Sequence, residues 1–352
     1  MLQHTTFTVK KMTRLSDLSI LLCLFIPLFL ANTGCMSDIS QGQNSLNITT
    51  TTQTMSISDS SKIIAISTGG THNMALRENG TILAWADKSA WNRRSHDIYN
   101  CKSGECDVPA NLTNVTAIAA GPGFSAALTK EGNVVAWGCD WDHYTPHVPR
   151  CGDDCPCRVP ANLTHVRSIS AGRYCIRAVR EDGTVTGWGG NPYHSCDVPP
   201  DLKNVSTVYA GESMSMALKA DGGVSAWGWY EGSVPVGNYK GIAAGYRYGL
   251  LLTNDGTVRA FRSAQLRDYQ YPTVPVYHPD LTNVTAISAG NNYFVALLEN
   301  RTVVYWGVTK SLSLKPGENA KALHNITAIS SQGLSNLALK DDGTVITWSF
   351  EF

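Results

Sequence analysis

The chain has 352 residues, and its 28 Lys and Arg balance its 28 Asp and Glu, so the formal net charge at pH 7 is zero. Proteins that bind nucleic acid usually carry clustered Lys and Arg for phosphate contacts, so this balance argues against that function class. A chain of this length can bury a large core, which favours one main domain.

The N-terminus has the features of an export signal. Lys10, Lys11 and Arg14 precede the uncharged apolar run 18–31. That run is short for a membrane-spanning helix and fits the hydrophobic region of a signal peptide. We therefore predict a signal peptide over 1–35 with a candidate lipidation site at Cys35; plain secretion and an uncleaved anchor are the alternatives. The Ser/Thr-rich stretch 36–53 predicts a tether.

From about residue 62 onward one pattern recurs seven times, most clearly as VTAIAAGPGFSAALTKEGNVVAWG at 115–138. Each copy has an apolar strand ending in Ala-Gly, a strand ending in Ala-Leu, a tight turn and a strand ending in Trp-Gly. Two sets of equivalent positions anchor the copies. The Gly column is Gly69, Gly121, Gly172, Gly211, Gly245, Gly290 and Gln332, and the Trp column is Trp85, Trp137, Trp188, Trp227, Phe261, Trp306 and Trp348.

Repeats of this length made of strands and turns are typical of β-propellers. We predict an all-β, seven-bladed propeller over 54–352 with four antiparallel strands per blade. Val-Pro connectors such as 107–109 predict the fourth, outer strand, because an edge strand tolerates Pro. Counting back ten residues from Ile66, as in the early copies, predicts that about 54–58 completes the last blade and closes the ring.

The turns within the copies predict glycine with positive φ, because most carry an acidic residue or Asn before Gly, as in Glu131-Gly132. The sixth copy has Asn300-Arg301 at this place, which predicts a looser turn.

The repeated words AAG…AL..DGTV.AWG, followed by VPANLTNV, resemble the regulator of chromosome condensation repeat family of seven-bladed propellers over about 62–350. The connector word is similar to the secreted bacterial and archaeal branch, which includes a secreted β-lactamase inhibitory propeller. The resemblance implies the propeller fold and binding through loops on one face. It does not extend to the nuclear exchange activity, because the chain has a signal-like segment and no basic face.

Antiparallel strands sort the loops onto two faces. The loop face carries the loops that follow the Gly column and the Trp column. The turn face carries the tight turns and the connectors that lead into the first strands. Eight candidate N-glycosylation sites fall on the turn face: Asn79, Asn111, Asn114, Asn162, Asn204, Asn283, Asn300 and Asn325. The alternative is that repeat copying multiplies them and that Asn and Thr cap turns.

Eight cysteines fall in loops of the opposite, loop face: Cys101, Cys106, Cys139, Cys151, Cys155, Cys157, Cys175 and Cys196. In long loops of an exported chain they predict disulfides, whose pairing the sequence leaves open. The alternative is a metal site of Cys139, Cys151, Cys155 and Cys157 with nearby His and Asp, although this spacing is loose for structural zinc. We predict no metal and no cofactor.

Aromatic residues gather in the same loops. The predicted binding residues are Trp91, Trp141, Tyr144, Tyr193, Trp229, Tyr230, Tyr246 and Tyr248. Tyr and Trp give large contact areas at low entropic cost and dominate binding hot spots. The alternative is that several of them pack beneath their own loops.

The sequence thus predicts a monomeric extracellular or cell-surface module that binds a protein or a surface glycan, contacts membranes only through its N-terminus and does not bind nucleic acid. No nucleophile motif accompanies the scattered His residues, so an enzyme is not predicted. The alternatives are a secreted inhibitor of an extracellular enzyme, a polysaccharide hydrolase or lyase, and a structural module without a specific ligand.

Overall fold

A computed structural model describes residues 49–51, 61–86, 101, 104–139, 155–191, 193–230, 233–262, 280–307 and 323–349. All of these residues belong to one compact unit, Leu46–Phe352. The regular elements among them are all strands. No helix in this described part is long and apolar enough to cross a membrane.

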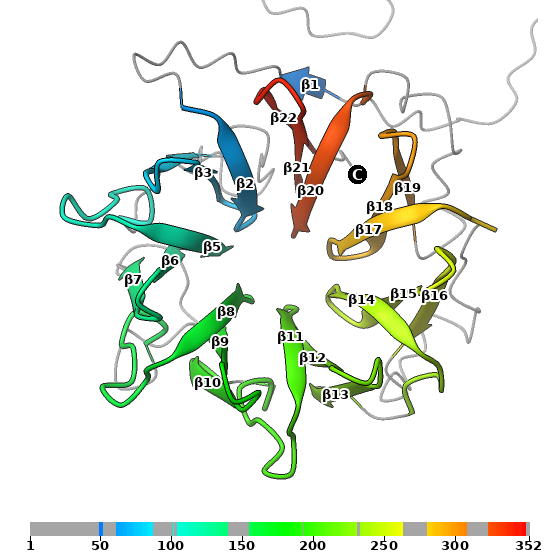
Figure 1. Cartoon of the computed structure of the whole chain (residues 1–352), viewed down its shortest axis with the longest axis horizontal. Helices are drawn as coiled ribbons and strands as arrows, with labels where there is room; N and C mark the ends of the chain where they lie inside the picture. Colours follow the sequence, from blue (N-terminus) through cyan, green and yellow to red (C-terminus); the bar gives the residue numbers. More distant parts are fainter. Residues whose placement is uncertain are drawn as a thin grey trace, which may run out of the picture. The chain divides into compact units, whose positions relative to one another are not determined.

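The strands form seven antiparallel sheets in chain order (Figure 1). Their bounds are β2 Ile63–Thr68, β3 His72–Arg77 and β4 Ile82–Ala86; β5 Val115–Gly121, β6 Phe124–Thr129 and β7 Val134–Gly138; β8 Val166–Ala171, β9 Cys175–Arg180 and β10 Val185–Gly189; β11 Val205–Ala210, β12 Met214–Lys219 and β13 Val224–Gly228; β14 Tyr239–Ala244, β15 Tyr248–Thr253 and β16 Val258–Arg262; β17 Val284–Ala289, β18 Tyr293–Leu298 and β19 Val303–Gly307; β20 Ile326–Gln332, β21 Ser335–Lys340 and β22 Val345–Ser349.

The sheets are the blades of a propeller, each with its first strand innermost (Figure 1). Each blade packs on the next, and β2 of the first blade contacts β20 and β21 of the last. The all-β, seven-bladed architecture predicted from the repeats is therefore confirmed.

The predicted fourth strand does not form in the described connectors, and six of the seven sheets have three strands. The connectors fold back on themselves instead. The Val108 amide donates to the Cys106 carbonyl at 3.0 Å, and the Leu112 amide donates to the Pro109 carbonyl at 3.0 Å. These local bonds use the groups that an added strand would need for pairing.

The last sheet has a fourth strand, β1 (Thr49–Thr51), which pairs antiparallel with β22 and sets Thr50 opposite Trp348. The segment predicted for this place, 54–58, lies outside the described residues. The pairing strand therefore lies earlier, inside the stretch predicted as a tether. Counting back a fixed number of residues assumed a constant connector length, and the connectors vary in length.

The core lies between consecutive blades, where the Trp column fills the wedge. Trp188 of the third blade packs with Phe124 and Leu128 of the second, and Trp348 of the last packs with Val295 of the sixth. Trp and Phe in this column bury large apolar surfaces, each stabilising the fold by a few kcal/mol.

The Trp column also holds the connectors in place. The indole Nε1 of Trp137 donates to the Glu105 carbonyl at 3.0 Å, and that of Trp227 donates to the Ser195 carbonyl at 2.9 Å. Trp188 makes the equivalent bond to the Pro156 carbonyl at 2.8 Å. Each of these connectors follows one blade and is bonded to the Trp of the next blade. Buried hydrogen bonds therefore hold the loops of the loop face in place.

The tight turns confirm the expected positive φ, which is 78° at Gly132. The turn at Asn300-Arg301, which was predicted to be looser, has the same geometry as the others. Arg301 adopts a φ of 63°, and its amide donates to the Leu298 carbonyl at 2.9 Å, as the Gly132 amide does to Thr129. The neighbouring Asn300 side chain accepts from the Thr302 amide at 3.1 Å, which supports the same geometry without glycine.

Candidate functional site

An aromatic–arginine cluster lies on the loop face over the third, fourth and fifth blades. It consists of Arg173, Tyr174, Tyr193, Trp229, Tyr246 and Arg247. The rings of Tyr193 and Trp229 stack, with centroids 5.1 Å apart and planes 3° from parallel. Tyr174 meets Tyr193 at 6.0 Å with a tilt of 56°. The stack joins loops of consecutive blades into one surface.

Two guanidinium groups cap these rings. The Cζ atom of Arg247 lies 5.1 Å from the Trp229 centroid and 4.9 Å from the Tyr246 centroid. Arg173 lies 5.4 Å from the Tyr174 ring. Such cation–π contacts contribute about 0.5–1 kcal/mol each at exposed sites. They also hold the long Arg side chains in fixed positions, so the surface is organised before a partner arrives.

Arg173 connects the cluster to the centre of the ring. Its Nη1 atom lies 3.2 Å from Oε2 of Glu212, whose residue is only 7% exposed. Burial raises the pKa of Glu212, and the positive charge of Arg173 and a hydrogen bond from Asn291 partly oppose this. The pair gives the loop face an exposed cation and a buried acid in direct contact.

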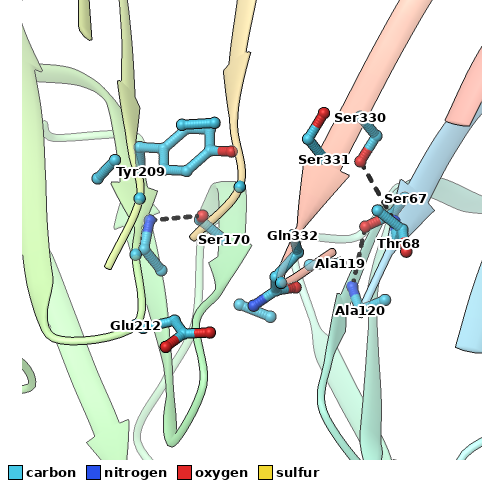
Figure 2. A pocket seen from close by; sticks show the side chains of 18 of the residues that line it. Ser67, Thr68, Ala119, Ala120, Ser170, Tyr209, Glu212, Ser330, Ser331 and Gln332 are labelled. Atoms are coloured by element: carbon cyan, nitrogen blue, oxygen red, sulfur yellow. Dashed lines mark hydrogen bonds between the residues drawn. The ribbon is translucent and has the colours of Figure 1, made fainter. Parts of the chain in front are cut away.

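A central cavity runs between the innermost strands of all seven blades, and about 130 Å³ of it is open to the centre of a water molecule. Its wall includes Tyr209, Glu212, Asn291 and a series of Ser and Ala side chains (Figure 2). Gln332, at the one place where the Gly column has a larger residue, points into this space. With its amide nitrogen turned toward them, it donates to the Thr68 and Ala120 carbonyls at 2.8 and 2.9 Å.

Serine side chains join neighbouring blades around the cavity (Figure 2). The Oγ atom accepts from a backbone amide of the next blade in four places: Ser67 from Ala120 at 3.0 Å, Ser170 from Ala210 at 2.9 Å, Ser288 from Ser331 at 2.9 Å and Ser330 from Thr68 at 3.2 Å. The last of these joins the seventh blade to the first.

The aromatic residues predicted for the site have different places. Tyr193, Trp229 and Tyr246 belong to the cluster. Tyr230 instead turns its ring edge toward Phe261 at 5.8 Å and packs on the core between the fourth and fifth blades. Tyr248 also packs on the core. Trp91, Trp141 and Tyr144 lie outside the described residues.

Sequence reasoning missed Arg173, Tyr174, Glu212 and Arg247. They directly follow the Gly column, as in Gly172-Arg173-Tyr174 and Gly245-Tyr246-Arg247. The residues at these positions differ from one copy of the repeat to the next, whereas the spacing of the Gly and Trp columns within a copy is constant. That variability could have pointed to the positions as candidate binding residues.

The structure pairs cysteines across the loop face. Cys101 bonds to Cys106, Cys139 to Cys157 and Cys175 to Cys196, and Cys155 is also disulfide-bonded. The sulfur atoms of Cys139, Cys155 and Cys157 lie within 4.8 Å of one another. Since a metal ligand is a thiolate, these oxidised sulfurs are not available for the alternative metal site. Cys151 and Cys35 lie outside the described residues.

The eight candidate glycosylation asparagines are all exposed. Four of them have a structural role of their own, because Asn114, Asn204, Asn283 and Asn325 adopt φ values of 55° to 60° just before a first strand. Asn tolerates this left-handed region better than most residues. The Asn79 side chain accepts from the Thr81 amide at 3.1 Å, which caps its turn.

Comparison with known proteins identifies the repeat. Residues 115–140 match the Regulator of chromosome condensation (RCC1) repeat. The RCC1 domain-containing protein RUG3, mitochondrial, of Arabidopsis thaliana is 30% identical over 135 residues, which are 36% of this chain and 30% of that protein. Protein pim1 of Schizosaccharomyces pombe is 21% identical over 295 residues, which are 80% of this chain and 44% of that protein. The chain thus spans less than half the length of these curated relatives.

Solved structures show the same fold. Prp20p of Saccharomyces cerevisiae, studied for its binding to Gsp1p and histones, has a TM-score of 0.58 and 18% identity, with 82% of each chain covered. The CRINKLY WD40 ectodomain of the Arabidopsis thaliana receptor kinase ACR4 has a TM-score of 0.54 and 16% identity, with 82% of this chain and 95% of that chain covered. The matched repeat, these relatives and the sevenfold pattern together support an RCC1-repeat propeller.

Proposed function

We propose that this RCC1-repeat propeller is an extracellular or cell-surface binding module that recognises a macromolecule, most simply a protein, through its loop face. The observation that carries the proposal is the aromatic–arginine cluster. Tyr, Trp and Arg are the residues enriched at binding hot spots, and here stacking and cation–π contacts fix them in place. A rigid surface loses less entropy on binding than a mobile one.

Further observations support this choice. Prp20p, a propeller of the same fold, binds proteins, and the ACR4 propeller is an ectodomain. Disulfides occur chiefly in exported proteins, and the disulfides of this chain support the loops that carry the cluster. The exposed asparagines of the turn face would direct any glycans away from it.

The test is affinity capture with the purified full chain from envelope and secreted material, followed by mass spectrometry. The double variant Trp229→Ala/Arg247→Ala removes the centre of the cluster and is expected to abolish capture of the specific partner. Asp201→Ala/Lys203→Ala, at exposed positions of the turn face, is the matched control and should retain capture. Equal capture by both variants would refute binding through the cluster.

The location of the protein requires its own measurement. We propose that residues 1–35 direct export and that Cys35 carries a lipid. Fractionation of expressing cells should then find the chain at the envelope, and Cys35→Ser should move it into the medium. Retention of the unprocessed chain inside the cell would contradict export.

A further inference from the structure

Three sulfur atoms meet in the connector between the second and third blades. The Sγ atoms of Cys139, Cys155 and Cys157, called here the sulfur cluster, all lie within 4.8 Å of one another. Cys139 is bonded to Cys157. Cys155 is bonded to a cysteine outside the described residues, since the other described cysteines pair among themselves. Two disulfides are therefore adjacent, and one sulfur of the second lies close to both sulfurs of the first.

The backbone is held in place on both sides of the sulfur cluster. The Cys139 amide donates to the Gly123 carbonyl at 2.8 Å. The carbonyl of Pro156, which separates the other two cysteines, accepts from the Trp188 indole at 2.8 Å. Because these bonds fix the main chain, the three sulfurs can change partners by side-chain rotation, without refolding of the connector.

The three cysteines differ in exposure. Cys139 and Cys155 are each 6% exposed and belong to the apolar core between the second and third blades. Cys157 packs against the same core but is only half-buried, so it is the residue at which we expect an external thiol to attack. A thiolate released at Cys139 would lie in apolar surroundings, where an unpaired charge is costly, and beside a disulfide that it can attack.

From this arrangement we propose that the sulfur cluster is a thiol–disulfide exchange site with two alternative pairings, switched by a small-molecule thiol. In the first pairing Cys139 is bonded to Cys157, as in the structure, and in the second it is bonded to Cys155. The exchange changes which residue ties the connector to the end of β7. This inference goes beyond the proposed function and does not depend on it.

The exchange takes three steps, each of which breaks one S–S bond and forms another. The external thiolate attacks Sγ of Cys157, which forms a mixed disulfide and releases the Cys139 thiolate. Cys139 then attacks Sγ of Cys155, which forms the Cys139–Cys155 bond and releases the thiolate of the former partner of Cys155. That thiolate, released beside Cys157, displaces the external thiol from it. The thiol is regenerated, and no net oxidant or reductant is consumed.

The test is a disulfide map of the full chain before and after incubation with reduced glutathione under native conditions. Free thiols are blocked with N-ethylmaleimide, and the unreduced digest is mapped by mass spectrometry. Fragmentation at the Cys155–Pro156 bond assigns the sulfur that is joined to Cys139. We expect Cys139–Cys157 alone before incubation and a mixture with Cys139–Cys155 after it. The Cys175–Cys196 bond should stay unchanged, because no third sulfur of the described residues lies close to it.

A pair of single variants tests the same point. Cys157→Ser removes the half-buried sulfur, and in glutathione buffer Cys139 should then be bonded to Cys155, with the former partner of Cys155 as the free thiol. Cys196→Ser is the matched control. It should leave Cys175 without a partner in the chain, because its bond has no neighbouring sulfur among the described residues.

An unchanged Cys139–Cys157 bond after incubation would overturn the proposal, even where Cys157→Ser re-pairs, because the native chain would then not exchange. Glutathione retained on Cys157 with maleimide on Cys139 would also overturn it, since the second step would have failed. Re-pairing of Cys175 in the same sample would indicate general unfolding and count against the proposal. If Cys157→Ser does not fold, the map of the unaltered chain decides. The measurement reads connectivity and not capture, so neither result bears on the proposed function.

Discussion

The Oγ atom of Ser330 accepts a hydrogen bond from the backbone amide of Thr68 at 3.2 Å, across 262 residues of sequence. The same bond joins Ser288 to Ser331 at 2.9 Å between the sixth and seventh blades. The contact between the last blade and the first therefore has the same chemistry as a contact between blades that are consecutive in the chain.

Ring closure through this contact predicts that Ser330→Ala and Ser288→Ala have similar effects. Each removes one acceptor, buried at Ser288 and partly buried at Ser330, and should lower the free energy of unfolding by about 1 kcal/mol. Ala is sterically acceptable, because Ala119 and Ala243 stand at this place in other blades. Urea unfolding monitored by Trp fluorescence measures the change. A loss for Ser288→Ala with none for Ser330→Ala would indicate that the ring is open in solution.

The repeat predicted the blades because its information is local and redundant. The Trp column fills the wedge between blades and bonds to the connectors, and the Gly column allows close approach of the strands. A Cβ atom on Gly172, for example, would lie 2.4 Å from the Gly211 carbonyl oxygen. The closing strand was misplaced because connector length follows no such rule. The cluster was only partly predicted, since the contact of Arg173 with Glu212 depends on how two blades meet and not on any spacing in the chain.

His72 predicts a pH dependence of stability. It is buried, its Nε2 atom lies 2.7 Å from Ser125 Oγ, and its Nδ1 atom has no partner. Since Ser125 donates its proton to the Glu105 carbonyl, Nε2 must carry the hydrogen. A second proton would sit on the unpartnered Nδ1, and burial accordingly lowers the pKa of His72 from 6.5 to about 3.

Between these two values the unfolded chain takes up a proton at this side chain and the folded chain does not. Stability should therefore fall as the pH drops from about 6.5 toward 3, with a contribution from His72 that approaches about 1.4 kcal/mol per pH unit. His72→Phe, which introduces the residue that Phe124 supplies at the same place in the second blade, should remove that contribution. Urea unfolding between pH 7 and 4.5 measures it, with exposed His165→Asn as the control. An unchanged slope in His72→Phe would show that other groups set the dependence.

Arg177 is a buried cation at a position of the repeat where the other blades carry apolar side chains. Its Nε and Nη2 atoms donate to the Ser195 carbonyl at 3.2 and 2.7 Å, its Nη1 atom has no partner, and burial lowers its pKa to about 9. Met74 and Met216 stand at this place in other blades. Replacing a buried charge by a well-packed apolar side chain is often stabilising.

Arg177→Met is therefore expected to raise the free energy of unfolding by about 1–3 kcal/mol at pH 7. The Ser195 carbonyl keeps two donors, Ser215 Oγ at 2.7 Å and Trp227 Nε1 at 2.9 Å. The reciprocal Met216→Arg should destabilise the fold, and thermal and urea unfolding of both variants provide the comparison. A clear loss of stability in Arg177→Met would instead assign Arg177 the role of holding the connector.

The bond between Cys175 and Cys196 connects the start of β9 to the connector that carries Tyr193, and it closes a loop of 21 residues. Removing both sulfurs in Cys175→Ala/Cys196→Ala should lower the free energy of unfolding by about 3 kcal/mol.

The Ser195 carbonyl remains bonded to Trp227 and Ser215, so the connector should stay attached while Tyr193, three positions before Cys196, loses a constraint. We expect the stacking of Tyr193 on Trp229 to weaken and partner capture to fall. Circular dichroism of the aromatic bands and affinity capture measure the two effects. Lower stability with unchanged capture would show that Tyr193 and Trp229 remain stacked without the disulfide.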